Sequence, residues 1–246
     1  MTSPAADGRA VRRARPLLGT LVEVGAVDGP GHAHDAAFAA IAEVQSQLSR
    51  FEAASDIAWF NTARAGECRV IGPHTRAVLA AARRLGDETH DLFDITLGTA
   101  PRQWRVEGDA LVKLVDGITF DLGGIGKGYA VDRAIDALAA AGCRAGWVNA
   151  GGDLRAFGDI DVPVSLRDEH GGGVRPLAQL RDGAIATSRF GKGARSTLSA
   201  HGAPDAHVSV AAPLCLWADA LTKLVAISGD TAHPALALHG AQAWLH

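Results

Sequence analysis

Apolar side chains recur at three- and four-residue spacings in several stretches of the chain, which is the pattern of amphipathic helices. In the first stretch, Phe38, Ile41 and Val44 fall on one face. Gly142 and Gly229 follow the last two stretches, where a glycine can end a helix. The predicted helices span residues 32–48, a stretch that starts near Pro73, residues 129–141 and residues 217–227.

Short runs of β-branched and apolar residues, bounded by glycine, proline and aspartate, predict strands elsewhere. The first is expected over residues 17–24, with Gly19 as a bulge or a point of close ligand approach. Residues 51–61 are interpreted as a polar connection between two helices. Because helices and strands are partly segregated along the chain, the pattern favours an α+β fold over a doubly wound parallel sheet. The other predicted strands span residues 146–149, 162–166, 184–187 and 207–211.

Length and composition are those of an ordinary folded protein, with 246 residues, 48% apolar and 21% charged. The net charge of −3 gives no general attraction to nucleic acid or to anionic membranes, so any anion site has to be local. Residues 1–15 are rich in arginine and are expected to form a mobile leader before a domain at 16–246. The absence of a signal-like or membrane-spanning stretch and the odd number of cysteines lead us to expect a cytoplasmic protein.

Residues 121–132, Asp-Leu-Gly-Gly-Ile-Gly-Lys-Gly-Tyr-Ala-Val-Asp, place four glycines and a lysine just before a predicted helix. A glycine-rich turn that leads into a helix presents free N–H groups and the positive end of the helix dipole, which suits phosphate. The segment is not a Walker A loop, because Gly128 follows Lys127 where that motif has Ser or Thr. A tight turn with an exposed lysine remains an equal interpretation of this segment alone.

Together with several other segments, this run resembles the family of FAD:protein FMN transferases, also called the thiamine-biosynthesis lipoprotein ApbE family. The resemblance covers roughly residues 15–245, and its strongest parts are residues 121–132 and the Asn-Ala-Gly-Gly-Asp run at 149–153. The other matching segments are residues 18–20, 55–61, 93–96, 184–188 and 218–221.

The resemblance implies an ApbE-like α+β fold, with mixed or antiparallel sheets, packed helices and a pocket for FAD. It also implies an enzyme that moves FMN from FAD to a Thr or Ser hydroxyl of an acceptor protein and releases AMP. Such a transfer requires neutralised phosphate charge, a proton acceptor and in-line positioning. FAD and the acceptor protein are therefore the expected partners. Nucleic acid is not, because no interleaving of basic and aromatic residues is present.

The matching segments also suggest which residues bind the flavin nucleotide. Gly124 is expected to allow close backbone approach or a positive φ. Simpler structural interpretations stay open for four of these residues: Asp94 and Asp153 as turn caps, Asp132 as a partner of the helix dipole, and Asn61 as the end of a loop. The predicted binding residues are Leu18, Gly19, Thr20, Asn61, Asp94, Gly123, Gly124, Gly126, Lys127, Asp132, Asn149, Gly151, Gly152, Asp153, Thr187 and Ser188.

Members of the family bind Mg²⁺ through an Asp, a Thr four residues later and a backbone carbonyl near the lysine. Asp219 and the carbonyl of Gly126 match these ligands, but Lys223 stands at the Thr position. Thr222 is the alternative hydroxyl, through a shifted helix register. Because Asp219 and Lys223 are four residues apart on a helix, they can form an ion pair that competes with Mg²⁺. We therefore expect Lys223 to replace the metal at least in part.

A family stretch whose His and Asp are tied to catalysis, Ser-His-Ile-Ile-Asp-Pro-x-Thr-Gly, is replaced here by residues 196–204, with Thr197 at the His position. His201 is a nearby candidate for the proton acceptor, although a surface histidine is the simpler interpretation. The predicted catalytic residues are Asp219, Lys127 and His201. Two alternative functions use the same pocket: a degenerate protein that only binds FAD, and an FAD pyrophosphatase that forms FMN and AMP.

Overall fold

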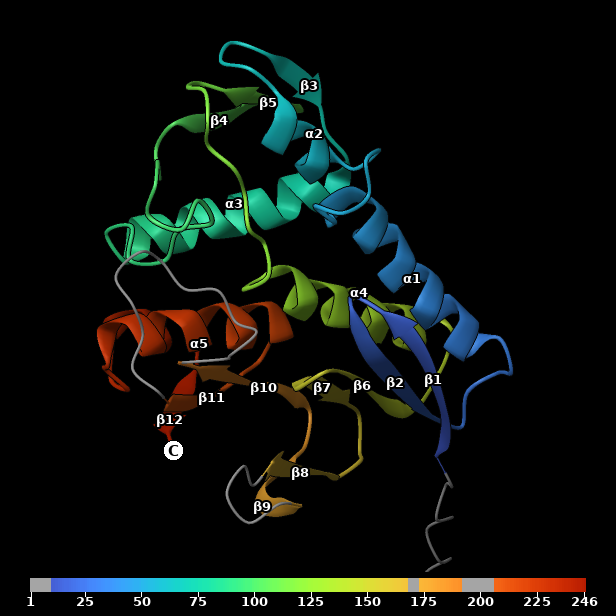
Figure 1. Ribbon diagram of the computed structural model, residues 1–246. Helices are drawn as coiled ribbons and strands as arrows, with labels where there is room; N and C mark the ends of the chain where they lie inside the picture. The colour runs from blue at the N-terminus through green and yellow to red at the C-terminus, as the bar shows by residue number, and fades with distance from the viewer. Residues whose placement is uncertain (1–9, 168–172, 192–205) are drawn as a thin grey trace, which may run out of the picture.

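A seven-stranded antiparallel sheet forms the centre of the computed structural model, which describes residues 10–167, 173–191 and 206–246 (Figure 1). Hydrogen bonds join its neighbouring strands in the order given. The strands are β1 (Val11–Leu17), β2 (Thr20–Val27), β6 (Ala145–Ala150), β7 (Asp153–Phe157), β10 (Gly183–Phe190), β11 (Ala206–Ala212) and β12 (Gln242–Leu245).

Different elements cover the two faces of this sheet. Helices α4 (Gly126–Ala140) and α5 (Cys215–Ser228) lie on one face, and α1 (Ala33–Leu48) packs beside α4 (Figure 1). The ribbon of β8 (Val162–Arg167) and β9 (Val174–Leu180) lies on the other face. Because side chains alternate along a strand, β10 sends Ala186 into the helix-side core and Ile185 into a smaller core under the ribbon.

A second group of elements lies beyond α1 and α4 in Figure 1. Helices α2 (Asp56–Thr62) and α3 (Pro73–Glu88) contact α1. Strands β3 (Cys68–Val70), β5 (Ala110–Lys113) and β4 (Trp104–Glu107) form a three-stranded sheet in that order. Helix α6 (Pro234–Leu238) precedes β12. Among the described residues, no helix combines the length and apolar character that crossing a bilayer requires.

The α+β class with antiparallel sheets is confirmed, and so are the helices predicted at 32–48, after Pro73 and at 217–227. Helix α4 begins at Gly126, three residues before the predicted start. Its first turn contains Gly128, and a Cβ there would lie 2.2 Å from the carbonyl oxygen of Cys215. The backbones of α4 and α5 thus approach closely, and this tertiary contact favours a helical turn over the loop that glycines suggest locally.

The strand predicted at 17–24 is confirmed over residues 20–24, which belong to β2, but its start is wrong because Leu17 belongs to the other strand of a hairpin. Leu18 and Gly19 have φ values of 54° and 70° and form the turn between β1 and β2. The mobile leader predicted at 1–15 is also wrong from Val11 onward, where β1 begins. Strand β1 lies at the edge of the sheet with mostly exposed side chains, so it has no apolar alternation to detect. Arg15 bonds Asp35 at 2.6 Å and helps to hold it.

The polar connection predicted at 51–61 is wrong in its second half, where α2 forms. Ser55 caps this helix by accepting a hydrogen bond from the N–H of Ala58 at 3.0 Å. Ile57 and Phe60 are fully buried. The helix has only seven residues, too few to show a clear helical period. Several short elements were not predicted from the sequence: β3, β4, β5, β7, β9, β12 and α6.

Candidate active site

A cavity of about 810 Å³ lies where strand pairing in the main sheet stops, and its size is in the range of small-molecule sites. Strand β7 pairs with β10 only as far as Ala186, whereas β11 pairs with β10 through Phe190. Past that point the β6–β7 turn contacts β10 through the N–H of Thr187, which donates to the carbonyl of Gly152 at 3.1 Å. The last residues of β10 therefore line the cavity.

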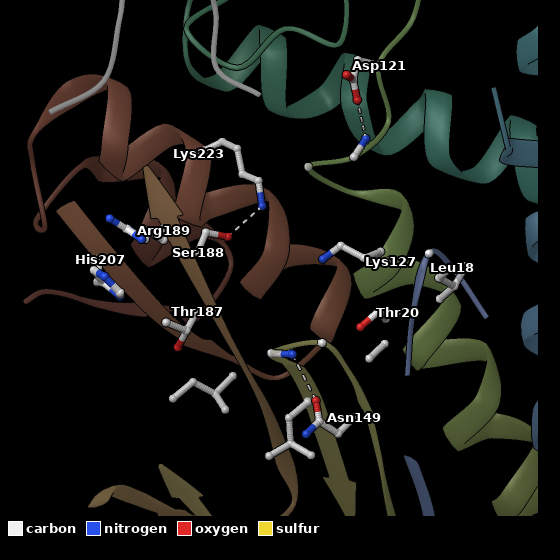
Figure 2. Close-up of a pocket in the computed structure, with 18 of the residues that line it drawn as sticks. Leu18, Thr20, Asp121, Lys127, Asn149, Thr187, Ser188, Arg189, His207 and Lys223 are labelled. Carbon is white, nitrogen blue, oxygen red and sulfur yellow. Dashed lines mark hydrogen bonds between the residues drawn. The ribbon is translucent and has the colours of Figure 1, made fainter. Parts of the chain in front are cut away.

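Most of the predicted binding residues meet at this cavity, although they come from segments far apart in the sequence. The β1–β2 turn, the loop before α4, the β6–β7 turn and β10 each contribute part of its wall (Figure 2). The binding role of these residues stays a prediction. The predicted residues that line the cavity are Leu18, Gly19, Thr20, Asp94, Gly123, Gly124, Lys127, Asn149, Gly151, Gly152, Thr187 and Ser188.

The β6–β7 turn depends on its two glycines. Gly151 and Gly152 have φ values of 64° and 106°, which L side chains rarely adopt. A Cβ on Gly151 would also lie 2.6 Å from the hydroxyl oxygen of Thr20, so this turn and the start of β2 are in direct contact. Asn149 accepts a hydrogen bond from the N–H of Gly152 at 3.1 Å. These contacts give the cavity a wall made largely of backbone.

Lys127 brings a positive charge to this wall from the first turn of α4. Its side chain is 31% exposed and its ammonium group bonds the carboxylate of Asp153, which is 1% exposed. Burial lowers the pKa of Lys127, but Asp153 and Asp219 raise it and prevail, so the group is a cation. Asp153 does not line the cavity among the described residues. It lies behind Lys127 and fixes the direction of the lysine.

Asp132 and Asp219 connect α4 and α5 by reciprocal hydrogen bonds. Asp132 on α4 accepts from the N–H groups of Cys215 and Leu216, both at 2.9 Å. Asp219 on α5 accepts from the N–H of Gly128 at 3.1 Å. Neither helix has a side-chain bond from its own N-cap residue. Each carboxylate therefore satisfies N–H groups in the first turn of the other helix.

Asp132 was predicted to bind the ligand, and the structure contradicts this. Its carboxylate bonds Arg155 at 2.8 Å in addition to the two N–H groups, and it is 2% exposed. Burial raises its pKa. Asp132 is absent from the cavity wall, so its position in the glycine-lysine segment reflects the packing of α4 on α5.

Lys223, rather than Asp219, contributes to the cavity wall on α5 (Figure 2). Asp219 is fully buried, and its Oδ1 accepts a bond from the Nζ of Lys223 at 2.5 Å, which confirms the predicted ion pair. Burial raises the pKa of Asp219, but the charges of Lys223 and Lys127 outweigh it and the pKa is lowered. Lys223 also donates to the hydroxyl of Ser188 at 3.1 Å.

Thr222 does not offer its hydroxyl to the cavity, which contradicts its prediction as a metal ligand. The hydroxyl donates to the carbonyl of Asp219 at 2.7 Å and lies 3.1 Å from the Oγ of Ser188, and the residue is fully buried. Gly126, whose carbonyl was the third predicted ligand, is also absent from the cavity wall. Helix α5 keeps its regular register here, so Lys223 faces the cavity and Thr222 does not.

Asn61 was predicted to bind flavin, but its amide bonds the backbone of Phe120. It accepts from the N–H of Phe120 at 2.7 Å and donates to the carbonyl of the same residue at 3.1 Å. The side chain thus ties α2 to the segment that leads into residues 121–132. Asp94 lines the cavity and also accepts from the N–H groups of Thr96 and Gly98, both at 2.9 Å, as expected of a turn residue.

Gly124 was predicted to allow close backbone approach or a positive φ, and the structure contradicts the positive φ. Close backbone approach to the ligand stays a prediction. A Cβ at Gly124 would lie 3.0 Å from the Cε of Lys223. The missing side chain thus leaves room for the stem of Lys223. His201, the predicted proton acceptor, lies outside the described residues.

His207 and Arg189 were not among the binding residues predicted from the sequence. Both line the cavity (Figure 2). They are paired in register on β11 and β10, so their side chains lie on the same face of the sheet. Strands were predicted close to both positions, but the sequence does not show that β10 and β11 are neighbours or that the cavity lies against them.

Comparison with known proteins agrees with the fold. Residues 18–245 match the model of the ApbE family, and the chain belongs to this family. An FAD:protein FMN transferase of Vibrio cholerae serotype O1 is 24% identical over 177 residues, which are 58% of this chain and 53% of that protein. The chain spans about half the length of this curated relative in the match.

Solved structures of ApbE proteins show the same fold. The apo flavinyl transferase ApbE of Pseudomonas stutzeri superposes with a TM-score of 0.80 at 24% identity, over 97% of this chain and 91% of that one. The flavin transferase ApbE of Vibrio cholerae gives a TM-score of 0.81 at 20% identity, over 97% and 93%. The ApbE protein of Thermotoga maritima gives 0.81 at 21% identity, over 96% and 94%.

Proposed function

We propose that this protein is an FAD:protein FMN transferase, which moves FMN from FAD to a Thr or Ser hydroxyl of an acceptor protein and releases AMP. The observation that carries the proposal is the cavity, where Gly-rich turns, apolar side chains and the two cations Lys127 and Lys223 meet. Membership of the ApbE family and the activity named for the Vibrio cholerae relative support it.

The cavity offers different chemistry to the different parts of FAD. Apolar side chains from four segments, among them Leu18, Phe93, Leu166 and Ile185, offer contact to the isoalloxazine ring. Lys127 offers positive charge and the backbone at Gly124 offers an N–H group to the pyrophosphate, whereas the N–H of Gly123 donates to Asp121 at 2.8 Å. We therefore assign the flavin to the apolar part of the wall and the pyrophosphate to the two lysines.

The transfer exchanges one phosphorus–oxygen bond for another. The acceptor hydroxyl oxygen attacks the phosphorus on the riboflavin side, and the bond to the bridging oxygen breaks. AMP leaves with that oxygen, and the hydroxyl proton passes to a base. Lys127 and Lys223 stabilise the negative charge that develops on the phosphate oxygens. For Lys127, the nearby Asp153 and Asp219 raise the pKa against the effect of burial, which favours the charged form that this role requires.

For the base, His201 stays a prediction and His207 is the imidazole among the described cavity residues. Replacing each histidine separately by alanine distinguishes them. Loss of the true base lowers AMP release by about 10²–10⁴-fold, whereas the other variant retains its rate. Equal retention in both variants contradicts a histidine base.

The proposed activity is tested by incubating the protein with FAD, Mg²⁺ and a domain that carries a flavinylation site. Covalently bound flavin on the acceptor together with AMP in equal amount is the expected result. AMP without labelled acceptor identifies a pyrophosphatase, and neither product identifies a protein that only binds FAD. Either outcome rejects the transferase proposal.

We also propose that the protein acts in the cytoplasm. Cys68, Cys143 and Cys215 are free thiols, which persist most readily in a reducing compartment. Fractionation of cells that express the untagged protein tests this, and recovery outside the cytoplasm contradicts it.

A further inference from the structure

Asp219 is the position at which members of the family would bind Mg²⁺, but its surroundings do not fit this ion. Both carboxylate oxygens already accept hydrogen bonds, Oδ1 from Lys223 at 2.5 Å and Oδ2 from the N–H of Gly128 at 3.1 Å. Mg²⁺ requires near-octahedral oxygen coordination and usually keeps several waters. Asp219 is fully buried, and the hydroxyl of Thr222 donates to the carbonyl of Asp219. Neither side chain therefore presents a ligand oxygen to open space, where a metal ion with its waters could bind.

No group of three or more His, Cys, Asp or Glu side chains in the described parts of the chain is arranged to hold a metal ion. The position next to Asp219 is taken by an ammonium group instead. To bind a metal at this carboxylate, the protein would have to displace Lys223, which is 8% exposed and held by Ser188 as well.

We propose that the ammonium group of Lys223 replaces the divalent metal ion, so that this protein binds the pyrophosphate of its donor nucleotide without Mg²⁺. The inference rests on the proposed function, because it assigns the pyrophosphate to this part of the cavity. Lys223 lines the cavity, and its stem lies against Gly124, in the segment that also carries Lys127. The two lysines thus reach the same wall from two helices (Figure 2).

The charges of the two lysines and their aspartate partners fit the binding of a pyrophosphate. Lys127 bonds Asp153 and Lys223 bonds Asp219, so each cation has one buried carboxylate behind it. The hydrogen bonds to these partners hold both ammonium groups in place beside the cavity. The longest bond of Lys223, at 3.3 Å to the carbonyl of Asp219, is the weakest, so that N–H can turn to a phosphate oxygen most easily. An ammonium group supplies one fixed charge without the octahedral geometry of Mg²⁺.

FAD titration of the metal-free protein, followed by flavin fluorescence, tests the proposal. In the wild type, we expect the Kd in EDTA to stay within about threefold of the Kd in Mg²⁺. In Lys223→Thr, we expect FAD to bind at least about tenfold more weakly in EDTA and to recover with Mg²⁺, because the threonine offers a hydroxyl and frees Asp219. Circular dichroism of each variant confirms that it is folded.

A matched control removes a lysine elsewhere. Lys113 is buried in the three-stranded sheet, donates to the carbonyl of Phe60 at 2.9 Å and is absent from the cavity wall. Lys113→Met and Lys223→Met remove the same group from two buried sites. We expect the first to keep its FAD affinity and the second to lose it. Paramagnetic resonance of free Mn²⁺ gives a separate measurement, and only Lys223→Thr is expected to bind the ion.

Three results overturn the proposal. If the FAD affinity of the wild type falls by more than about threefold in EDTA and recovers with Mg²⁺, the protein uses a metal ion. The proposed transferase function then stands, but the proposal that Lys223 replaces the metal does not. Unchanged FAD affinity in folded Lys223→Met and Lys223→Thr shows that the lysine only joins the helices. Wild-type protein that binds no FAD in either condition overturns the proposed function together with this inference.

Discussion

Asp132 and Asp219 are both buried aspartates that connect α4 and α5, but they pair with different cations. Asp132 accepts from two N–H groups of α5 and pairs with Arg155, which is 17% exposed and absent from the cavity wall. Asp219 accepts from one N–H of α4 and pairs with Lys223, which lines the cavity. The same helix-capping contact therefore serves packing at one site and orients a cavity cation at the other.

This difference shows that a buried carboxylate within a sequence motif does not by itself identify a residue of the ligand site. Burial raises the pKa of Asp132. For Asp219, burial also raises the pKa, but Lys223 and Lys127 prevail and lower it. The identity and position of the cationic partner decide which aspartate belongs to the site. Variants of the two aspartates, and of Gly128 at the contact between α4 and α5, test the distinction.

The largest effect is expected from Asp132→Ala, measured as stability. The substitution leaves Arg155 without its buried partner and two N–H groups of α5 unsatisfied. Breaking a buried ion pair from one side costs about 3–5 kcal/mol. Urea unfolding measures the change in the free energy of unfolding, and a loss of less than about 1 kcal/mol contradicts the structural role.

Asp219→Ala is expected to act mainly on catalysis. It removes the carboxylate that orients Lys223, so we expect AMP release to fall by ~10²-fold or more, the range found when one electrostatic stabiliser is lost. AMP release is measured under conditions in which the variant is fully folded. A decrease of less than about threefold means that Asp219 has no part in the reaction.

Gly128→Ala is expected to separate the two helices. The added Cβ would lie 2.2 Å from the carbonyl oxygen of Cys215 and 2.8 Å from the Cβ of Asp219. Overpacking of this kind costs about 1–3 kcal/mol in the free energy of unfolding. Gly126→Ala is the control, because a Cβ there meets Leu122 at an ordinary 3.6 Å. Equal stability of the two variants would show that α4 and α5 adjust without strain.

The smallest effect is in the pH dependence of stability, where the two aspartates should have opposite signs. The lowered pKa of Asp219 gives stability that is present above the ordinary Asp pKa of 3.8 and is lost as the pH falls through the folded value. The raised pKa of Asp132 makes stability fall as the pH rises from 3.8 to its folded value. Each slope is at most about 1.4 kcal/mol per pH unit.

Urea unfolding of Asp219→Asn and Asp132→Asn at a series of pH values measures these slopes. The difference between the wild type and Asp219→Asn should grow with pH, and that for Asp132→Asn should shrink. The same sign for both variants contradicts the assignment of their charged partners.

The sequence alone determined the amphipathic helices, the α+β class and most of the cavity segments. Periodic apolar residues such as Phe38 and Ile41 identify a helix because its face is fixed by local geometry. The glycines at 151 and 152 were recognised from the Asn-Ala-Gly-Gly-Asp run at 149–153, and their positive φ values favour glycine at both positions. Local chemistry is sufficient for such features, and the resemblance to the ApbE family rested on them.

The tertiary structure decided which polar side chains face the cavity. Asn61 binds the backbone of Phe120, and Asp132 binds α5, because elements distant in the sequence place N–H groups beside them. His207 reaches the cavity because β11 pairs with β10, and Lys223 does so because α5 packs beside Gly124. A hydrogen bond or an ion pair depends on which groups come within about 3 Å, and only the packing of the whole chain sets those distances.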